Sequence, residues 1–324
     1  MCERICGLTD ECRICHNRDG NRTHIAKEMQ FGTLEEFAYL ECADCGCLQI
    51  ASVPDDLAGH YPRDYYSFGP LDPPKPTRLM SFLKHHHAGW QIGKPDVVGW
   101  LTAKRFAHWR IPWLEHTKVD FDQPILDVGC GSGAMLHTLS VLGYSNLTGV
   151  DPFVDEDLSY PNGIRVLKLH LSEVSESYRL VYCSHAFEHM PDPLASLKQM
   201  RRVLDSDGWV VLRIPVSDCA AWKTYGVNWV QLDAPRHLYL HNERTIAALA
   251  DQCGLRVDKV EYDSTAFQFT GSEGYTRGIP LVDQRPDAQY SSRTLIDYAS
   301  RARILNDQKL GDQATFYLRA VTSA

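Results

Sequence analysis

A glycine-rich loop between an apolar strand and a helix constrains the fold of this chain more than any other feature. Residues 124–129 form an apolar run typical of a buried strand, and a helical pattern follows at 134–142. Between them lies Asp127-Val-Gly-Cys-Gly-Ser-Gly133. Small residues let the backbone approach a ligand, and the N-terminus of the helix offers unpaired N–H donors. We therefore expect an α/β domain that binds a ligand where this strand ends.

The alternation of strands and helices continues toward the C-terminus, which predicts a mostly parallel sheet with helices on both faces. The segments expected to be strands are 147–150, 164–169, 180–184, 209–214, 255–262 and 314–321, and those expected to be helices are 194–204, 242–253 and 293–307.

The charge before the loop separates two classes of ligand. Gly129, Gly131 and Ala134 also fit the dinucleotide pattern, and Asp151 lies 20 residues after Gly131, where a ribose-binding acid is expected. Asp127, however, would lie close to a dianionic pyrophosphate, at a cost on the order of a few kcal/mol at most. The same acid attracts the ammonium and sulfonium groups of S-adenosylmethionine. The charges therefore favour this cofactor, with a nicotinamide-dependent dehydrogenase and a glycine turn without a ligand as the alternatives.

Four segments, in order, resemble the motifs of class I S-adenosylmethionine-dependent methyltransferases. They are Ile-Leu-Asp-Val-Gly-Cys-Gly-Ser-Gly at 125–133, Gly-Val-Asp-Pro at 149–152, Leu-Val-Tyr-Cys-Ser-His-Ala-Phe-Glu-His at 180–189 and the block at 203–215. The resemblance implies an α/β fold with a Rossmann-like seven-stranded sheet whose last strand is antiparallel. The two strands expected nearest the C-terminus would form its closing hairpin.

The same resemblance implies which residues hold the cofactor. The loop supplies backbone contacts, and Asp151 takes the ribose hydroxyls. Many family members have an acid at the position of His170, where it meets the adenine amine, so backbone groups near Leu171 are expected to bind the adenine edge here. The residues expected at the cofactor are Asp127, Gly129, Cys130, Gly131, Gly133, Asp151, Pro152, His170, Leu171 and His185.

The cysteines mark a separate N-terminal region. Seven of the eleven lie before residue 48, and four of these form two Cys-x-x-Cys pairs. Two such pairs complete a tetrahedral zinc site, and four thiolates leave no open coordination position, so the zinc is expected to be structural. Redox cysteines and inert buried thiols are the alternatives. The expected ligands are Cys12, Cys15, Cys42 and Cys45, whereas Cys2, Cys6 and Cys47 have no fourth partner at a comparable spacing.

These features divide the chain into three parts. Residues 1–60 are expected to form a zinc-binding, zinc-ribbon-like module, and residues 121–324 the cofactor-binding core. Six prolines between residues 54 and 76 are typical of a connecting segment, and aromatic-rich helices follow. We therefore expect residues 61–120 to be a linker and a helical lid over the substrate, in which Tyr65 is a further candidate base.

A zinc-bearing N-terminal region joined to such a core resembles the sugar methyltransferases. This resemblance implies a sugar or nucleotide-linked sugar as the acceptor. The carbon-methylating members of that group usually carry a further C-terminal domain, which favours transfer to a hydroxyl here. The alternatives are an RNA or protein methyltransferase that uses the zinc module as a reader, and a non-catalytic zinc-binding scaffold.

Charge and hydropathy limit the partners and the compartment. The 33 basic and 41 acidic residues give a net charge of −8, which argues against a nucleic-acid partner. The sequence has no apolar run of about 18 residues, and its first residues lack the apolar core of a secretion signal. We therefore expect a cytoplasmic protein with reduced thiols and no membrane partner. The sequence leaves a homodimer open.

Transfer to a hydroxyl needs a group that takes the proton of the acceptor. His237 is expected to be that base or to orient the acceptor, because an imidazole titrates near neutral pH. His189, at the end of the fourth strand, is expected to be secondary, and Tyr239 shares the face of His237 if the segment is extended. Arg236 is expected either to face a substrate phosphate or to pair with Asp233.

Overall fold

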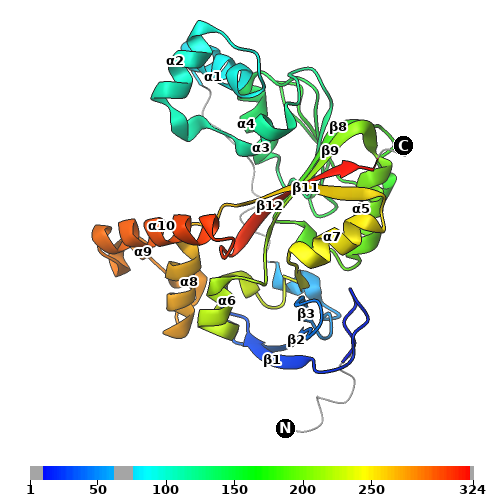
Figure 1. The fold of residues 1–324 in the computed structure, drawn as a ribbon, viewed down its shortest axis with the longest axis vertical. Coiled ribbons are helices and arrows are strands. Elements are labelled where there is room, and N and C mark those ends of the chain that lie inside the picture. Colours follow the sequence, from blue (N-terminus) through cyan, green and yellow to red (C-terminus); the bar gives the residue numbers. More distant parts are fainter. Residues whose placement is uncertain (1–9, 62–75, 322–324) are drawn as a thin grey trace.

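The fold of the chain is built on two β-sheets (Figure 1). The structure, a computed structural model, describes residues 10–61 and 76–321. Tyr65, Cys2 and Cys6 lie outside the described residues. The core sheet has the order β11-β12-β9-β8-β4-β5-β7-β6. Its strands are β4 (Ile125–Val128), β5 (Leu147–Val150), β6 (Leu158–Ser159), β7 (Arg165–Leu167), β8 (Tyr178–Ser184), β9 (Leu204–Pro215), β11 (Leu255–Tyr262) and β12 (Gln313–Ala320).

The pairing of these strands confirms the predicted α/β sheet. Strands β4, β5, β7, β8 and β9 pair in parallel, whereas β12 pairs antiparallel with both β9 and β11. These seven strands have the expected arrangement, including the closing hairpin. The two-residue strand β6 adds an antiparallel pairing with β7 at one edge, which the sequence did not predict.

Each face of the core sheet has its own hydrophobic core, because side chains alternate along a strand. Leu212 of β9 belongs to one core and Val211 to the other. Helices α5 and α7 cover the first face, while α4, α1 and α3 cover the second (Figure 1). The helices are α1 (Arg78–Gln91), α2 (Val97–Arg105), α3 (Pro112–Thr117), α4 (Ala134–Leu142), α5 (Pro193–Arg202), α6 (Ala220–Tyr225), α7 (Glu243–Asp251), α8 (Phe267–Thr276), α9 (Pro286–Gln289) and α10 (Ser292–Asp307).

A strand from the core completes the N-terminal sheet. Strands β1 (Arg22–Lys27), β2 (Glu36–Glu41) and β3 (Leu48–Ile50) pair antiparallel in chain order, and β10 (Tyr239–Leu240) pairs with β3. Trp229 packs into the same hydrophobic cluster as the side chains of this sheet. The N-terminal module is therefore joined through sheet pairing and apolar packing to the segment that follows β9.

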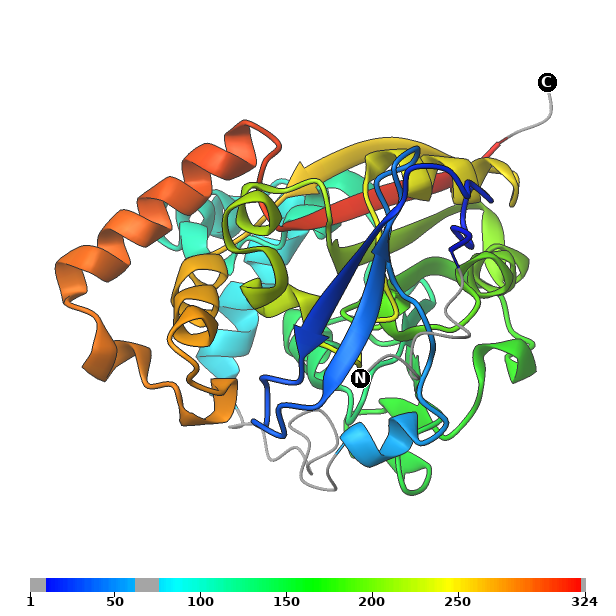
Figure 2. The ribbon, with the colours of Figure 1, turned by 90° about the horizontal axis from the view of Figure 1, so that it is seen from below.

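Two groups of helices extend from this frame. The helices expected between residues 77 and 118 are present, and Gly93, with a φ of +87°, lies at the break between α1 and α2. Helices α8, α9 and α10 are inserted between β11 and β12 and extend away from the sheet (Figures 1 and 2). None of the helices in the described part of the chain has both the length and the apolar character that crossing a membrane requires.

Candidate functional site

The glycine loop has the backbone geometry expected of a ligand cradle. Gly129, Gly131 and Gly133 all have positive φ angles, of +70°, +52° and +89°. A Cβ atom on Gly129 would lie 2.4 Å from the Cβ of Ala186, so this position also requires glycine for close packing. At the end of β5, Asp151 accepts a hydrogen bond from the backbone N–H of Gly131, at 2.9 Å. The structure thus brings the loop and the predicted ribose-binding acid together.

Two buried acids give this loop a preference for cations. Asp127 is 5% exposed, and burial, with Asp151 nearby, raises its pKa to about 8. Burial also raises the pKa of Asp151. A positively charged ligand would favour the ionised form of both carboxylates, whereas a pyrophosphate would oppose it. These residues therefore fit the ammonium and sulfonium groups of S-adenosylmethionine.

The remaining predicted cofactor residues lie at the same edge of the sheet. His170 and Leu171 follow β7, where the His170 N–H donates to Glu173 at 2.8 Å. His185 follows β8 with a φ of +52°, and its Nε2 accepts a hydrogen bond from Arg213 at 2.8 Å. Contacts between these side chains and the cofactor remain predictions, as they do for Cys130 and Pro152.

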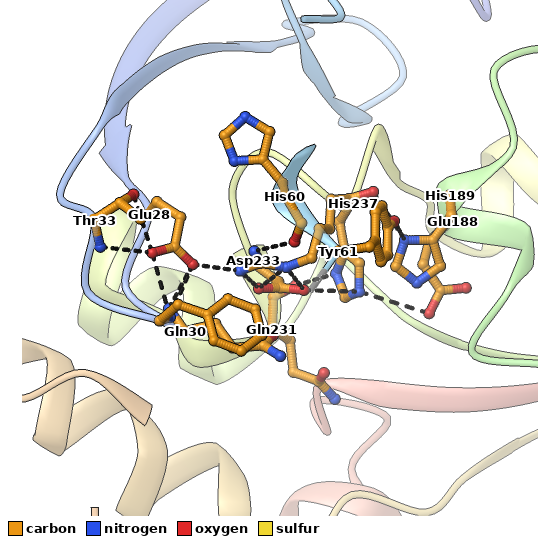
Figure 3. Close-up of polar contacts among 12 residues, drawn as sticks. Glu28, Gln30, Thr33, His60, Tyr61, Glu188, His189, Gln231, Asp233 and His237 are labelled. Atoms are coloured by element: carbon orange, nitrogen blue, oxygen red, sulfur yellow. Dashed lines mark hydrogen bonds and ion pairs between the residues drawn. The ribbon is translucent and has the colours of Figure 1, made fainter. Parts of the chain in front are cut away.

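The structure brings His189 and His237 together, with ring centroids 4.7 Å apart. Nδ1 of His189 lies 2.8 Å from the carbonyl oxygen of Arg236, and Nδ1 of His237 lies 2.7 Å from that of Gln231. A carbonyl oxygen can only accept, so each Nδ1 carries the proton and each Nε2 has a free lone pair. Tyr61 Oη lies 3.0 Å from Nδ1 of His189 (Figure 3).

Two carboxylates flank this histidine pair. Nε2 of His237 is 3.8 Å from Oε1 of Glu188 and 3.8 Å from Oδ2 of Asp233 (Figure 3). Burial lowers the pKa of His237 to about 4, and the neighbouring His189 acts in the same direction. Burial by itself raises the pKa of Glu188, but contacts with His185, His189 and His237 reverse this shift and bring it to about 2. At neutral pH the cluster therefore presents a neutral imidazole beside an ionised carboxylate.

Arg236 has a structural role. It is 0% exposed, and its guanidinium lies 2.6 Å from Asp233 and 2.8 Å from Glu28. Both carboxylates and the carbonyl of His60 occupy its donors. Of the two roles expected for this residue, the structure shows the pairing with Asp233. Glu28 was not predicted, because a single acid in a turn between two strands carries no sequence signal.

Tyr239 lies apart from the histidine pair. Its hydroxyl donates to the carbonyl of Pro191 at 3.2 Å, and the guanidinium of Arg13 lies 4.8 Å from its ring centre. Tyr239 belongs to β10, so its ring packs in the N-terminal sheet. A different tyrosine, Tyr39, donates to the backbone carbonyl of His237 at 2.8 Å.

The four predicted zinc ligands form a single cluster. The Sγ atoms of Cys12 and Cys45 are 3.6 Å apart and those of Cys15 and Cys42 are 3.4 Å apart, and all four lie within 4.8 Å of one another. Thiolates bound at about 2.3 Å to a tetrahedral zinc are about 3.8 Å apart. The donor set and its spacing therefore fit a structural zinc. Cys47 is buried nearby but is not part of the cluster.

Comparisons with known proteins match the core. Residues 100–260 match a family model described as a methyltransferase domain. The chain is 27% identical over 155 residues to a ubiquinone biosynthesis O-methyltransferase of Albidiferax ferrireducens. The aligned region covers 42% of this chain and 56% of that protein. The chain is also 25% identical over 150 residues to a tRNA U34 carboxymethyltransferase of Nautilia profundicola. That aligned region covers 42% of this chain and 40% of the relative. The match thus spans about half the length of these curated relatives.

Among solved structures, an S-adenosylmethionine-dependent methyltransferase from Mesorhizobium loti is 16% identical, with a TM-score of 0.41 over 67% of this chain and 99% of that one. The family match agrees with the glycine loop, the paired acids and the strand order described above. Residues 100–260 are a class I S-adenosylmethionine-dependent methyltransferase domain.

Proposed function

We propose that this protein transfers a methyl group from S-adenosylmethionine to a hydroxyl of a small molecule of sugar type. One observation carries the proposal: the glycine loop and the cluster of Glu188, His189 and His237 lie side by side. The loop follows β4, and the cluster begins in the short 3₁₀ helix Phe187–His189 that follows β8, the neighbour of β4 in the sheet. Gly129 of the loop approaches Ala186, three residues before His189. The carboxyl ends of neighbouring parallel strands are where open α/β sheets bind ligands.

The residues at this edge have separate roles in the reaction. When bound, S-adenosylmethionine supplies a methyl group on a positively charged sulfur. Asp127 and Asp151 hold the charged and ribose ends of the donor beside the loop. The cluster holds the acceptor hydroxyl and favours loss of its proton while the C–O bond forms. The C–S bond breaks, and its electron pair remains on sulfur. Such alignment of donor and acceptor lowers the activation free energy, by on the order of 7–11 kcal/mol in well-oriented cases.

The histidine pair suits a hydroxyl acceptor. Both rings keep their Nδ1–H on a backbone carbonyl, so both Nε2 lone pairs are available. His189 is partly exposed, whereas His237 is 6% exposed. We therefore place the acceptor against His189, with His237 behind it, which reverses the order expected from the sequence. The O-methyltransferase relatives support a hydroxyl as the acceptor, whereas the sugar class rests on the resemblance of the zinc-bearing N-terminal region.

The test is methyl transfer from labelled S-adenosylmethionine to a panel of nucleotide sugars, free sugars, phenols and tRNA. We expect label in a sugar hydroxyl, and loss of transfer in Asp151→Ala. Label in phenols alone would replace the sugar class and keep the reaction. Transfer confined to tRNA, or no transfer by a protein that binds S-adenosylhomocysteine, would contradict the proposal.

A further inference from the structure

We propose that Glu188, His189 and His237 bind a divalent transition-metal ion at the acceptor site. One ligand atom from each of these residues lies within 4.8 Å of those of the other two. Nε2 of His237 and Oε1 of Glu188 are 3.8 Å apart. Ligand atoms bound at about 2.1 Å to one ion are at most about 4.2 Å apart, so only small side-chain shifts are needed. Two imidazoles and one carboxylate form a donor set that binds divalent transition metals and leaves coordination positions open.

The surroundings of both histidines match those of metal ligands. A histidine that binds a metal through one nitrogen almost always donates its other N–H to a carbonyl or carboxylate. His189 does so to the carbonyl of Arg236, and His237 to the carbonyl of Gln231. These bonds fix both rings with Nε2 unprotonated, in the orientation shown in Figure 3. Both rings are therefore preorganised to coordinate a cation.

Glu188 provides the independent observation that points to a ligand. Its side chain is 0% exposed, and neither carboxylate oxygen has a hydrogen-bond partner within the described residues. The nearest ring nitrogen, Nδ1 of His185, is 3.5 Å from Oε1. A buried carboxylate without hydrogen bonds is costly unless a cation offsets its charge. The burial of Glu188 thus calls for a positive charge close to its oxygens.

The neighbouring arginines already have partners. Arg236 pairs with Glu28 and Asp233. Arg213 pairs with Asp263 and donates to His185. A metal ion between Glu188 and the two histidines would supply the missing charge.

The proposed ion would have a role in catalysis that rests on the proposed function. With three protein ligands, its open positions could take the acceptor oxygen, and its charge would lower the pKa of that hydroxyl. The hydroxyl proton would then pass to water as the methyl group is transferred. His189 and His237 would act as ligands, in place of the free-base role expected from the sequence. Metal binding itself does not depend on this role.

The test measures binding of Mn²⁺ alone, with the zinc-loaded protein, by electron paramagnetic resonance and calorimetry. Mn²⁺ prefers carboxylate and imidazole donors to a site of four thiolates. We expect one Mn²⁺ per chain, with affinity at least tenfold weaker in Glu188→Gln and in His189→Gln. The matched control is Glu41→Gln, which alters a carboxylate that contacts His24 at 2.8 Å on the N-terminal sheet. This control should bind Mn²⁺ as the wild type does.

Binding of S-adenosylhomocysteine shows that each variant is folded. Wild-type protein that binds no Mn²⁺, or Mn²⁺ affinity unchanged in both cluster variants, would overturn the metal site. If Glu188→Gln fails to fold, His189→Gln decides in the same way. Methyl transfer without added metal, in protein shown to bind none, would reject the metal and keep the proposed function. Mn²⁺ binding without transfer to any acceptor would keep the metal and reject the function.

Discussion

At the residue scale, the proposed contact of Asp127 with the cofactor predicts how binding depends on pH. Burial, with Asp151 nearby, raises the pKa of Asp127 to about 8, so this carboxyl is mostly protonated in the free protein at neutral pH. The ammonium group of the ligand prefers the ionised form. Binding should therefore release a proton at neutral pH, and affinity should rise as pH increases toward the pKa of the free protein.

The first prediction follows from this expected rise of affinity with pH. Between pH 6 and 8, the affinity for S-adenosylhomocysteine should increase up to about tenfold per pH unit, and it should level off above pH 8. Calorimetry in buffers of different ionisation enthalpy measures both the affinity and the released proton. Asp127→Asn should remove the dependence. An equal slope in wild type and Asp127→Asn would show that another group is responsible.

Arg236 pairs with the buried carboxylate of Glu28 and with the largely buried carboxylate of Asp233, so its loss should reduce stability. Replacing it with glutamine leaves Glu28 and Asp233 without the guanidinium that pairs with both. Breaking a buried ion pair from one side costs about 3–5 kcal/mol. We expect Arg236→Gln to lower the free energy of unfolding by that amount, measured by denaturant titration. The matched control is Arg244→Gln, because Arg244 is 68% exposed and pairs with Asp44 on the surface.

The control should change stability by about 1 kcal/mol or less, as exposed ion pairs do. Equal effects of the two substitutions would mean that the buried network does not hold the N-terminal module to the core. If the buried network does hold the N-terminal module to the core, the Arg236 variant should lose the structure of both regions in one transition.

At the scale of elements, β10 links the four-cysteine cluster to the segment that carries His237. The strand pairs with β3, and the two residues before it in the chain are His237 and Leu238. The backbone N–H of Ile50 donates to the carbonyl of Leu238, and Tyr39 donates to that of His237. The N-terminal sheet thus positions the backbone on which the histidine cluster depends.

The third prediction concerns Cys42, one of the four proposed zinc ligands. Cys42→Ser should remove the zinc and expose the N-terminal sheet, and hydrogen exchange should then increase in β10 and around His237. S-adenosylhomocysteine binding should persist, because the loop rests on β4 and β5. Cys253→Ser, which changes a cysteine outside the cluster, should keep the zinc. Protection unchanged across β10 in zinc-free protein would show that the two regions are independent.

The same elements show what the sequence could and could not predict. The core strands and helices were predicted within a few residues, since apolar periodicity and the glycine loop are local signals. The pairing of β10 with β3 was not predicted, because two residues carry no periodicity and the partner lies about 190 positions away. The grouping of the four cysteines was predictable from their spacing. Glu28 and the burial of Glu188 were not, because both depend on contacts between distant segments.

At the scale of the whole molecule, the site lies where the core sheet meets the N-terminal sheet. Helices α5 and α7 cover one face of the core sheet and α4 the other (Figure 1). The parallel strands β4, β5 and β8 end at a common edge between these faces. The glycine loop and the cluster of Glu188, His189 and His237 share this edge. The N-terminal module contacts the segment that carries His237 through the ion pair of Glu28 with Arg236 and through the pairing of β3 with β10. In the proposed function, donor binding and acceptor activation therefore depend on different residues along this edge.

This separation can be measured directly in the variant His189→Ala, assayed for both turnover and affinity for S-adenosylhomocysteine. We expect turnover to fall by about 10² or more, with cofactor affinity nearly unchanged, because the loop and its two acids remain intact. The matched control is His116→Ala, which alters a histidine that contacts Asp258 at 3.1 Å, away from the site. Turnover in His189→Ala within a few-fold of wild type would contradict the placement of the acceptor at this cluster.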